Sequence, residues 1–196
     1  MKPALTELSD EQLFGRMRQG DEAAFTALYR RRQGSIYRFS LQMSGNPSVA
    51  EEVTQEVFLA VIRGAGQFDV ERGNLQAWLF GAARNQVRKH LDAGWRYVSM
   101  ESDAGDVEAP ADGPADSNGS ILDSLAREEM LDAVRKAVLT LPPHYREALV
   151  LCDLQELPYE QAALALGVGV GTVKSRLNRG RAMLAGRLRA PVGKGA

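Results

Sequence analysis

The chain has 196 residues, of which 44% are hydrophobic and 25% charged, and its formal net charge is −1. This composition is typical of a soluble globular protein and excludes a wholly disordered one. The longest apolar run, residues 162–171, is shorter than the roughly 20 residues that a membrane-spanning helix needs, and the N-terminus lacks the apolar segment of a signal peptide. We therefore expect a cytoplasmic protein without membrane insertion.

The reactive side chains do not form the groupings that enzymes use. The chain has a single cysteine, Cys152, in an apolar stretch, and its two histidines, His90 and His144, are far apart in sequence. We find no Ser-His-Asp arrangement, no ligand cluster for zinc and no phosphate-binding loop. The sequence predicts an inert core thiol, no catalytic residue, no cofactor and no metal, so an enzyme remains an unsupported alternative.

Positive and negative charges are segregated along the chain. Residues 99–126 carry seven acidic and no basic residues, whereas residues 172–196 carry seven basic and no acidic residues. Ala, Asp, Gly, Pro and Ser dominate the acidic stretch, which predicts a flexible linker over residues 99–120. The chain is therefore divided into an N-terminal domain (1–98), the linker, a C-terminal domain (121–190) and a tail (191–196).

Helical spacing dominates the N-terminal domain. Ser9 and Gln12 predict a capping box at the start of a first helix, and apolar residues recur at helical spacing from Asp21 onward. Pro47 suits the first position of a third helix. Apolar stripes predict the third and fourth helices: Val49, Val53, Val57 and Val61, then Leu75, Leu79, Ala83, Val87 and Leu91. Because no stretch alternates with period two, the fold class is all-α.

The C-terminal domain is also helical in pattern. A helix that starts near Ile121 ends before Pro142-Pro143, and a second helix is expected over residues 144–153. A short helix, a tight turn at Gly167 and a longer helix then follow. This order predicts a helix-turn-helix.

The last helix has two distinct faces. Its buried face is predicted to hold Val173, Leu177, Gly180 and Leu184, whereas Thr172, Ser175, Arg176 and Arg179 share another face. Hydroxyl and guanidinium groups suit the base edges and phosphate oxygens of a DNA major groove. A basic surface helix without a ligand is the alternative. A dinucleotide loop at Gly167, Gly169 and Gly171 would need a preceding strand, but an Ala/Leu-rich helix precedes them.

These motifs, in this order, resemble a bacterial RNA polymerase sigma factor of the extracytoplasmic-function (ECF, group IV) subfamily of the sigma-70 superfamily. Residues 157–184, with the core Val170-Gly171-Thr172-Val173-Lys174-Ser175-Arg176-Leu177, are similar to sigma region 4. Residues 50–58 resemble the polymerase-binding segment of region 2, and residues 78–85 resemble its promoter-melting helix. The resemblance implies two small helical domains, region 2 and region 4, joined by the flexible acidic linker.

The resemblance also implies a function and partners. A sigma factor binds core RNA polymerase at the β′ clamp and the β flap, directs it to promoter DNA, catalyses nothing itself and is controlled by an anti-sigma factor. The implied polymerase-binding residues are Glu52, Gln55, Glu56 and Phe58. Those for the minus-ten strand are Phe68, Asn74, Arg84, Asn85, Arg88 and Lys89, and those for the minus-thirty-five duplex are Thr172, Lys174, Ser175, Arg176 and Arg179.

Several assignments stay open at this point. Phe58 either contacts polymerase or lies in the core, and Phe80 either stacks on a base or lies in the core, where Trp78 is expected. A stand-alone helix-turn-helix regulator would explain the C-terminal domain, but it would leave Glu52 and Arg84 without a role. As a sigma factor, each domain alone would bind DNA weakly, and polymerase would set their spacing.

Overall fold

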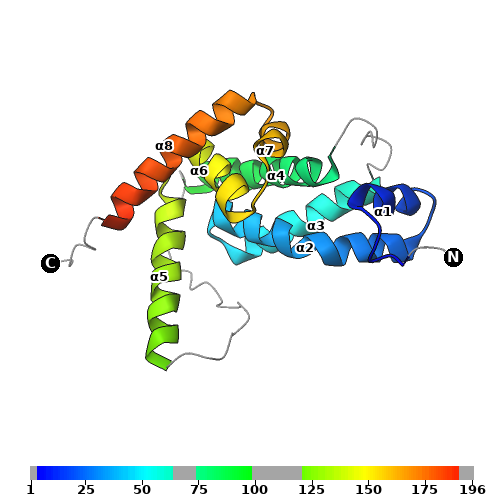
Figure 1. Ribbon diagram of the computed structural model, residues 1–196, viewed down its shortest axis with the longest axis horizontal. Helices are drawn as coiled ribbons and strands as arrows, with labels where there is room; N and C mark the ends of the chain where they lie inside the picture. Colours follow the sequence, from blue (N-terminus) through cyan, green and yellow to red (C-terminus); the bar gives the residue numbers. More distant parts are fainter. Residues whose placement is uncertain (1–3, 64–73, 99–120, 190–196) are drawn as a thin grey trace.

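The computed structural model describes residues 4–63, 74–98 and 121–189, and every regular element in these ranges is helical. The all-α prediction is confirmed, whereas the expected linker, 99–120, and tail, 191–196, lie outside the described residues. In chain order the elements are α1 (Asp10–Met17), α2 (Glu22–Ser44), α3 (Pro47–Arg63), α4 (Leu75–Val98), α5 (Ile121–Leu139), α6 (Pro143–Leu149), the π-helical segment η1 (Val150–Leu154), α7 (Tyr159–Leu166) and α8 (Val170–Arg189) (Figure 1).

Side-chain caps define where the first helices start. The predicted capping box is confirmed: the backbone N–H of Gln12 donates to Ser9 Oγ over 3.2 Å, and the Ser9 N–H donates to Gln12 Oε1 over 2.9 Å. Asp21 accepts a hydrogen bond from the Ala24 N–H at the start of α2, which lowers the pKa of that carboxyl. Asn46 caps α3, as its Oδ1 lies 2.9 Å from the Ser48 nitrogen. These bonds satisfy N–H groups that have no partner within their own helices.

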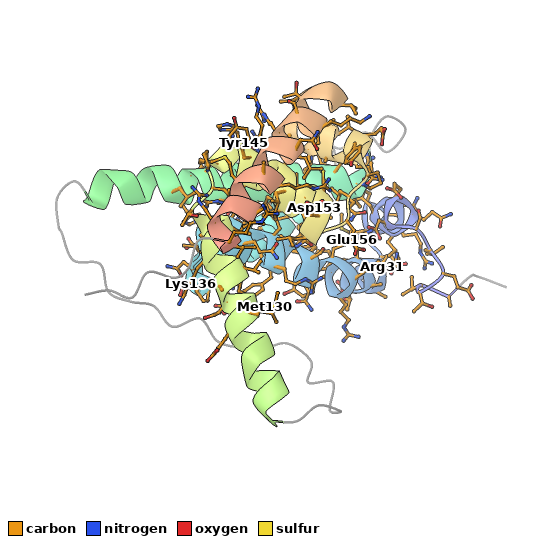
Figure 2. All side chains as sticks on the ribbon, turned by 60° about the vertical axis from the view of Figure 1, so that its left-hand side comes forward. Arg31, Met130, Lys136, Tyr145, Asp153 and Glu156 are labelled. Atoms are coloured by element: carbon orange, nitrogen blue, oxygen red, sulfur yellow. The ribbon has the colours of Figure 1, made fainter. Side chains whose placement is uncertain are left out.

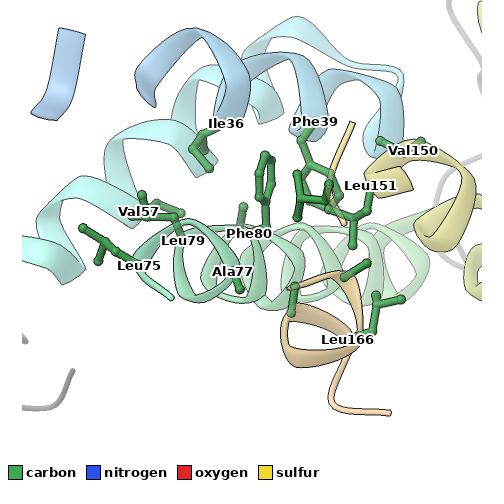
Figure 3. Packing of buried hydrophobic residues seen from close by; sticks show 14 of the residues in the cluster. Ile36, Phe39, Val57, Leu75, Ala77, Leu79, Phe80, Val150, Leu151 and Leu166 are labelled. Carbon is green, nitrogen blue, oxygen red and sulfur yellow. The ribbon is translucent and has the colours of Figure 1, made fainter. Parts of the chain in front are cut away.

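The two apolar stripes predicted for the N-terminal domain form its core. Val53, Val57 and Val61 of α3 are fully buried, and so are Leu75, Leu79 and Ala83 of α4. Helix α3 packs against both α2 and α4, so its buried face is wider than one stripe. Figure 3 shows Val57, Leu75 and Leu79 close together between α3 and α4.

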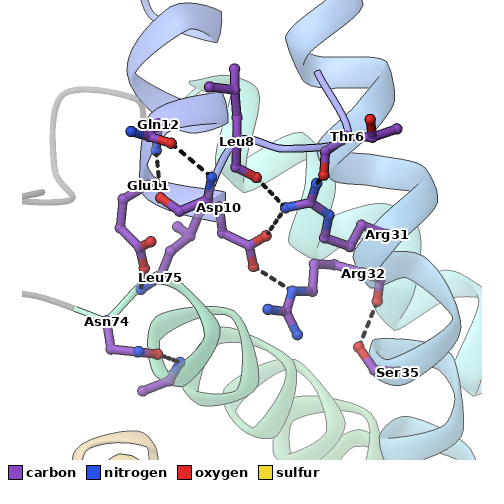
Figure 4. A network of polar contacts seen from close by, with 12 residues as sticks. Thr6, Leu8, Asp10, Glu11, Gln12, Arg31, Arg32, Ser35, Asn74 and Leu75 are labelled. Carbon is purple, nitrogen blue, oxygen red and sulfur yellow. Dashed lines mark hydrogen bonds and ion pairs between the residues drawn. The ribbon is translucent and has the colours of Figure 1, made fainter. Parts of the chain in front are cut away.

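A polar network joins α1 to α2 and to the start of α4 (Figure 4). The buried carboxylate of Asp10 pairs with Arg31 over 3.0 Å and also with Arg32. Arg31 additionally donates to the carbonyl oxygen of Leu8 over 2.7 Å. Glu11 Oε1 accepts a hydrogen bond of 3.3 Å from the Leu75 N–H. The first residue of α4 is therefore fixed by a side chain from α1.

The second helix of the C-terminal domain differs from its prediction. A single helix was expected over residues 144–153. In the structure α6 ends at Leu149, and the π-helical segment η1 follows it directly. The Gln155 N–H donates to the Val150 carbonyl oxygen over 2.9 Å, which is the five-residue spacing of a π-helix. The expected burial of Ala148 and Leu149 is confirmed, whereas Cys152 is only half-buried.

The two domains pack against each other, which the sequence did not reveal. Helix α7 packs against α4, and α2 is contacted by α5, α6 and η1. Figure 3 shows Val150 and Leu151 of η1 beside Phe39 of α2. The Phe39 ring meets that of Phe80 edge to face, with centroids 5.4 Å apart. Buried side chains of both domains thus form one continuous core.

Candidate nucleic-acid interface

The turn between α7 and α8 has the geometry that a helix-turn-helix requires. Gly167 adopts φ +65°, a left-handed conformation that costs glycine little, and its N–H donates to the Leu164 carbonyl oxygen over 3.2 Å. The Val168 N–H donates to the Ala163 carbonyl oxygen over 3.1 Å. These bonds end α7 and redirect the chain into α8.

The predicted buried face of α8 is largely confirmed. Val173, Leu177 and Gly180 are buried, and Leu184 is half-buried against the core. Gly180 lies so close to α6 that a Cβ there would be 3.2 Å from the Tyr145 carbonyl oxygen. This approach determines which side of α8 faces solvent.

The opposite face presents the residues predicted to read duplex DNA. Thr172, Lys174, Ser175 and Arg179 are exposed, and Arg176 is half-buried. The Lys174 ammonium lies 5.6 Å from the centre of the Tyr159 ring, a cation–π distance. Hydroxyl and cationic groups therefore line one accessible strip at the N-terminal half of α8, where the helix dipole adds partial positive charge.

An ion pair that a helical wheel could not predict fixes the orientation of α8. Arg181 Nη2 lies 2.5 Å from Asp153 Oδ1, and Arg181 Nε lies 2.9 Å from Asp153 Oδ2. Bonding to this carboxylate raises the pKa of Arg181. In Figure 2, Tyr145 and Asp153 lie beside α8, on segments that precede the helix-turn-helix. The partners are 28 residues apart, so only the fold brings them together.

The cationic residues predicted on α4 are separated into two groups. Asn85 and Lys89 are exposed, whereas Arg84, which is half-buried, and Arg88, which is exposed, both contact the C-terminal domain. Arg84 Nε lies 2.9 Å and Arg88 Nη2 lies 3.0 Å from Oε1 of Glu147, which is 1% exposed. Sequence reasoning gave Glu147 no role, because a single glutamate in an amphipathic helix carries no distinguishing pattern.

The remaining candidates for the minus-ten strand have mixed outcomes. Asn74 caps α4, since its Oδ1 accepts a 2.9 Å hydrogen bond from the Ala77 N–H. Phe80 is 1% exposed and packs on Phe39, so its open assignment is settled as core. Trp78 is half-buried and packs against the core. Phe68 lies outside the described residues.

The predicted polymerase-binding residues do not all share a surface. Glu52 and Gln55 are exposed and Glu56 is half-buried. Gln55 lines a groove of 440 Å³ between α2 and α3, whose walls include Tyr29, Arg30, Gln33, Tyr37 and Glu51.

Phe58, in contrast, is 3% exposed, with its ring 4.7 Å from that of Tyr29 and 6.5 Å from that of Phe25. Of the two assignments that the sequence left open for Phe58, this structure places the residue in the core. The residue belongs to an aromatic cluster between α2 and α3.

The described residues offer little for other kinds of site. Within residues 4–63, 74–98 and 121–189, no group of three or more His, Cys, Asp or Glu side chains is placed to hold a metal ion. In the same ranges, no helix combines the length and apolarity needed to cross a membrane. Burial, reinforced by the charge of Asp153, raises the pKa of the Cys152 thiol to about 11.

Comparison with known proteins gives two family matches, one for each domain. The model of sigma-70 region 2 matches residues 28–97, and that of sigma-70 region 4 matches residues 131–184. The ECF RNA polymerase sigma factor SigE of Mycolicibacterium smegmatis is 34% identical over 170 residues, covering 84% of this chain. The chain spans 63% of the length of SigE.

Two further proteins are similar over most of their length. The RNA polymerase sigma-H factor of Pseudomonas aeruginosa is 32% identical over 181 residues, covering 90% of this chain and 92% of that protein. The sigma factor RpoE of Bartonella quintana, solved in complex with the anti-sigma factor NepR, superposes with a TM-score of 0.63 at 28% identity, covering 81% of this chain and 92% of that chain. The chain therefore belongs to the sigma-70 family of RNA polymerase sigma factors, in its ECF group.

Proposed function

We propose that this protein directs core RNA polymerase to specific promoters, acts in the cytoplasm where both are found, and catalyses no reaction itself. The observation that carries the proposal is the accessible strip on α8, in which Thr172, Ser175 and Arg179 face solvent while Val173 and Leu177 are buried. A rigid helix that presents hydroxyls and guanidiniums at its N-terminal half has the shape and the donors that a major groove accepts. In the proposed promoter complex this strip reads the minus-thirty-five duplex.

The N-terminal domain supplies the second contact. The groove between α2 and α3 combines aromatic, cationic and acidic walls and is lined by the exposed Gln55, whereas Oε2 of the exposed Glu52 lies 3.9 Å from Nδ1 of His90 on α4. Mixed polar and aromatic surfaces of this kind suit a protein partner, which we assign as the β′ clamp of polymerase. The C-terminal domain would meet the β flap, so that polymerase sets the distance between the two domains.

Helix α4 is assigned to the single strand of the minus-ten element. Asn85, Arg88 and Lys89 are exposed, and Arg84 lies one helical turn before Arg88, so the four residues can hold successive phosphates of a strand once the two arginines are released from Glu147. Because phosphate contacts position a protein without reading sequence, base recognition needs further groups from α4 or from residues 64–73.

An anti-sigma factor is the partner that we assign to the resting protein. Support comes from the similar RpoE of Bartonella quintana, whose structure contains the anti-sigma factor NepR.

Transcription from a reconstituted enzyme tests the proposal. The full chain is added to bacterial core RNA polymerase with fragmented genomic DNA, and the 5′ ends of the RNA are mapped. We expect starts that share two sequence elements and that are absent without the chain. Glu52→Lys should weaken co-purification with core polymerase, whereas Glu129→Lys, an equally exposed glutamate on α5, should not.

The same experiment separates a stand-alone helix-turn-helix regulator from a sigma factor. A regulator would bind duplex DNA through α8 without joining core polymerase and would create no new starts. If the chain neither co-purifies with polymerase nor alters its start sites, the proposed function is wrong.

A further inference from the structure

One buried carboxylate links the two domains. Glu147 of α6 contacts Arg84 and Arg88, which are one helical turn apart on α4. Arg88 also donates from Nε to Glu147 Oε1 over 3.1 Å. Both guanidiniums thus converge on a single oxygen atom. These are two of the four α4 residues assigned above to the phosphates of the promoter strand.

The polar groups of this clasp, Glu147 with Arg84 and Arg88, are incompletely satisfied. Glu147 Oε2 and Arg84 Nε are buried, and neither has an aligned hydrogen bond among the described residues. A buried ion pair that leaves polar atoms unbonded adds little net stability, because desolvation offsets the attraction. It nevertheless favours the arrangement in which the two domains are packed together, because separating them takes the Glu147 carboxylate away from both of its arginine partners. We call the protein closed when α6 and α7 pack on the N-terminal domain, as they do in this structure. The clasp therefore specifies the closed arrangement while adding little to its stability.

The surrounding contacts are also between domains. Arg146, next to Glu147, donates to the Met43 carbonyl oxygen at the end of α2 over 2.7 Å, and Gln155 Nε2 donates to Gln42 Oε1 over 3.1 Å. Helix α7 approaches α4 so closely that a Cβ on Gly81 would lie 3.3 Å from the Ala165 carbonyl oxygen. With these elements in place the side chain of Arg84 is 14% exposed and that of Arg88 is 49% exposed, so the packed domains cover Arg84 and leave Arg88 partly accessible.

We propose that Glu147 is an internal competitor of promoter DNA: in the closed protein its carboxylate takes the place of a strand phosphate on Arg84 and Arg88, and α4 captures the strand only after α6 and α7 move away. The inference rests on the strand-binding role proposed for α4. A carboxylate and a phosphate offer guanidinium the same charge-assisted acceptors, so the two ligands exclude each other. The α8 strip stays exposed in the closed form, so the competition affects the strand and not the duplex.

The first test changes only the charge of the competitor. Glu147→Gln keeps the size of the side chain, and Glu160→Gln, an exposed glutamate on α7, makes the same change in net charge away from α4. Binding of a fluorescein-labelled, 20-nucleotide single strand of mixed sequence is followed by anisotropy at several salt concentrations. We expect Glu147→Gln to bind at least about fivefold more tightly than the wild type, the lower end of typical coupling between sites. Glu160→Gln should match the wild type.

The salt dependence provides a readout that general loosening would not mimic. Two arginines released to phosphates should steepen the slope of log affinity against log salt by about 1.4, since each single-strand phosphate contact contributes about 0.7. Circular dichroism at the same temperature verifies that the Glu147→Gln protein is folded.

The second test holds the closed form together and so does not depend on a variant of the clasp. Gln42→Cys and Gln155→Cys are introduced with Cys152→Ser, because the two glutamine side chains already touch across the domains. A short bis(methanethiosulfonate) reagent bridges the two thiols, and dithiothreitol cleaves the bridge. We expect the bridged protein to lose strand binding and transcription with core polymerase, and cleavage to restore both. Each single-cysteine protein, treated alike, serves as the control.

The outcomes separate this inference from the proposed function. If bridged and cleaved proteins bind the strand with equal affinity and equal salt slope, the clasp does not compete with DNA and the inference is wrong. If Glu147→Gln and the bridge behave as expected but wild-type protein with core polymerase starts no RNA, the sigma function fails while the competition between carboxylate and phosphate stands.

Discussion

Helices α4 and α8 both place arginines beside polar side chains on one face, yet the fold treats the two faces differently. On α8 the strip of Thr172, Ser175 and Arg179 is exposed, and its neighbour Arg181 is held aside by Asp153. On α4 the arginines are paired with a glutamate from the other domain. The protein is thus arranged to meet duplex DNA and single-stranded DNA at different stages.

The difference shows what a helical wheel can and cannot decide. Periodicity assigns side chains to a face, because the spacing of 3.6 residues is a property of the helix alone. Access to that face depends on which other elements pack there, and the partners of α4 lie about 60 residues away in sequence, as 59 residues separate Arg88 from Glu147. The variants and measurements below either remove this difference between α4 and α8 or quantify it.

The largest effect is expected from Arg146→Met, which removes an anchor between the domains. The Arg146 guanidinium donates to the carbonyl oxygens of Met43, Leu139 and Leu141, and burial lowers its pKa. Loss of these charged hydrogen bonds should cost about 3 kcal/mol of the free energy of unfolding in urea. Arg135→Met, at an exposed position on α5, should change it by less than about 0.5 kcal/mol. Equal midpoints for the two variants would show that Arg146 does not hold the domains together.

Alkylation of Cys152 reports on η1, the segment that follows Glu147 of the clasp and contains Asp153, the partner of Arg181. With a pKa of about 11 against an ordinary value of 9.0, its thiolate fraction at pH 8 is about a hundredfold lower than that of a free thiol. Its reaction with iodoacetamide, measured by mass spectrometry, should be slower by that factor and keep rising through pH 10. A cysteine at the exposed Thr140, in a Cys152→Ser background, should level off above pH 9. Identical pH profiles would contradict the burial of the thiol.

Arg176→Ala tests the accessible strip on α8. If Arg176 bonds a guanine, its loss should weaken binding of a mapped promoter duplex by about 1–3 kcal/mol and leave unfolding unchanged. Arg187→Ala, an exposed arginine further along α8, is the matched control and should have a smaller effect. Anisotropy with the promoter and with an unrelated duplex distinguishes the roles: an equal loss on both sequences would mean that Arg176 only holds phosphate.

Much of the fold follows from local sequence signals. Ser9 with Gln12, Pro47, Gly167 and the valine stripe of α3 each have a local physical cause, namely capping, fixed φ, tolerance of positive φ and period-four burial. The buried face of α8 was correctly predicted for the same reason. Local chemistry was therefore sufficient for most of the elements and for the inner face of α8.

Three features needed tertiary information. The resemblance implied a polymerase contact for Phe58, and the sequence left the core as the alternative. Ala50, Thr54 and Phe58 form a second buried row because α3 lies between α2 and α4. Glu147 gave no signal at all, because its meaning comes from a long-range partner. The acidic and basic blocks of the sequence suggested independent domains. This charge pattern gives no indication of the apolar contacts that η1 and α7 make with the N-terminal domain.

The smallest effect compares two glycines in helices. Alanine is favoured over glycine within a helix by up to about 1 kcal/mol, and Gly186→Ala on α8 should show this gain because nothing lies within 4 Å of its added Cβ. At Gly81 the same Cβ would press on the Ala165 carbonyl oxygen at 3.3 Å, which is backbone and does not rotate away. Gly81→Ala should therefore gain less or nothing in urea unfolding, and it should strengthen strand binding by loosening α7 from α4. An equal gain at both glycines, with unchanged strand affinity, would mean that α7 shifts without cost and that close packing at Gly81 does not help to keep α4 covered.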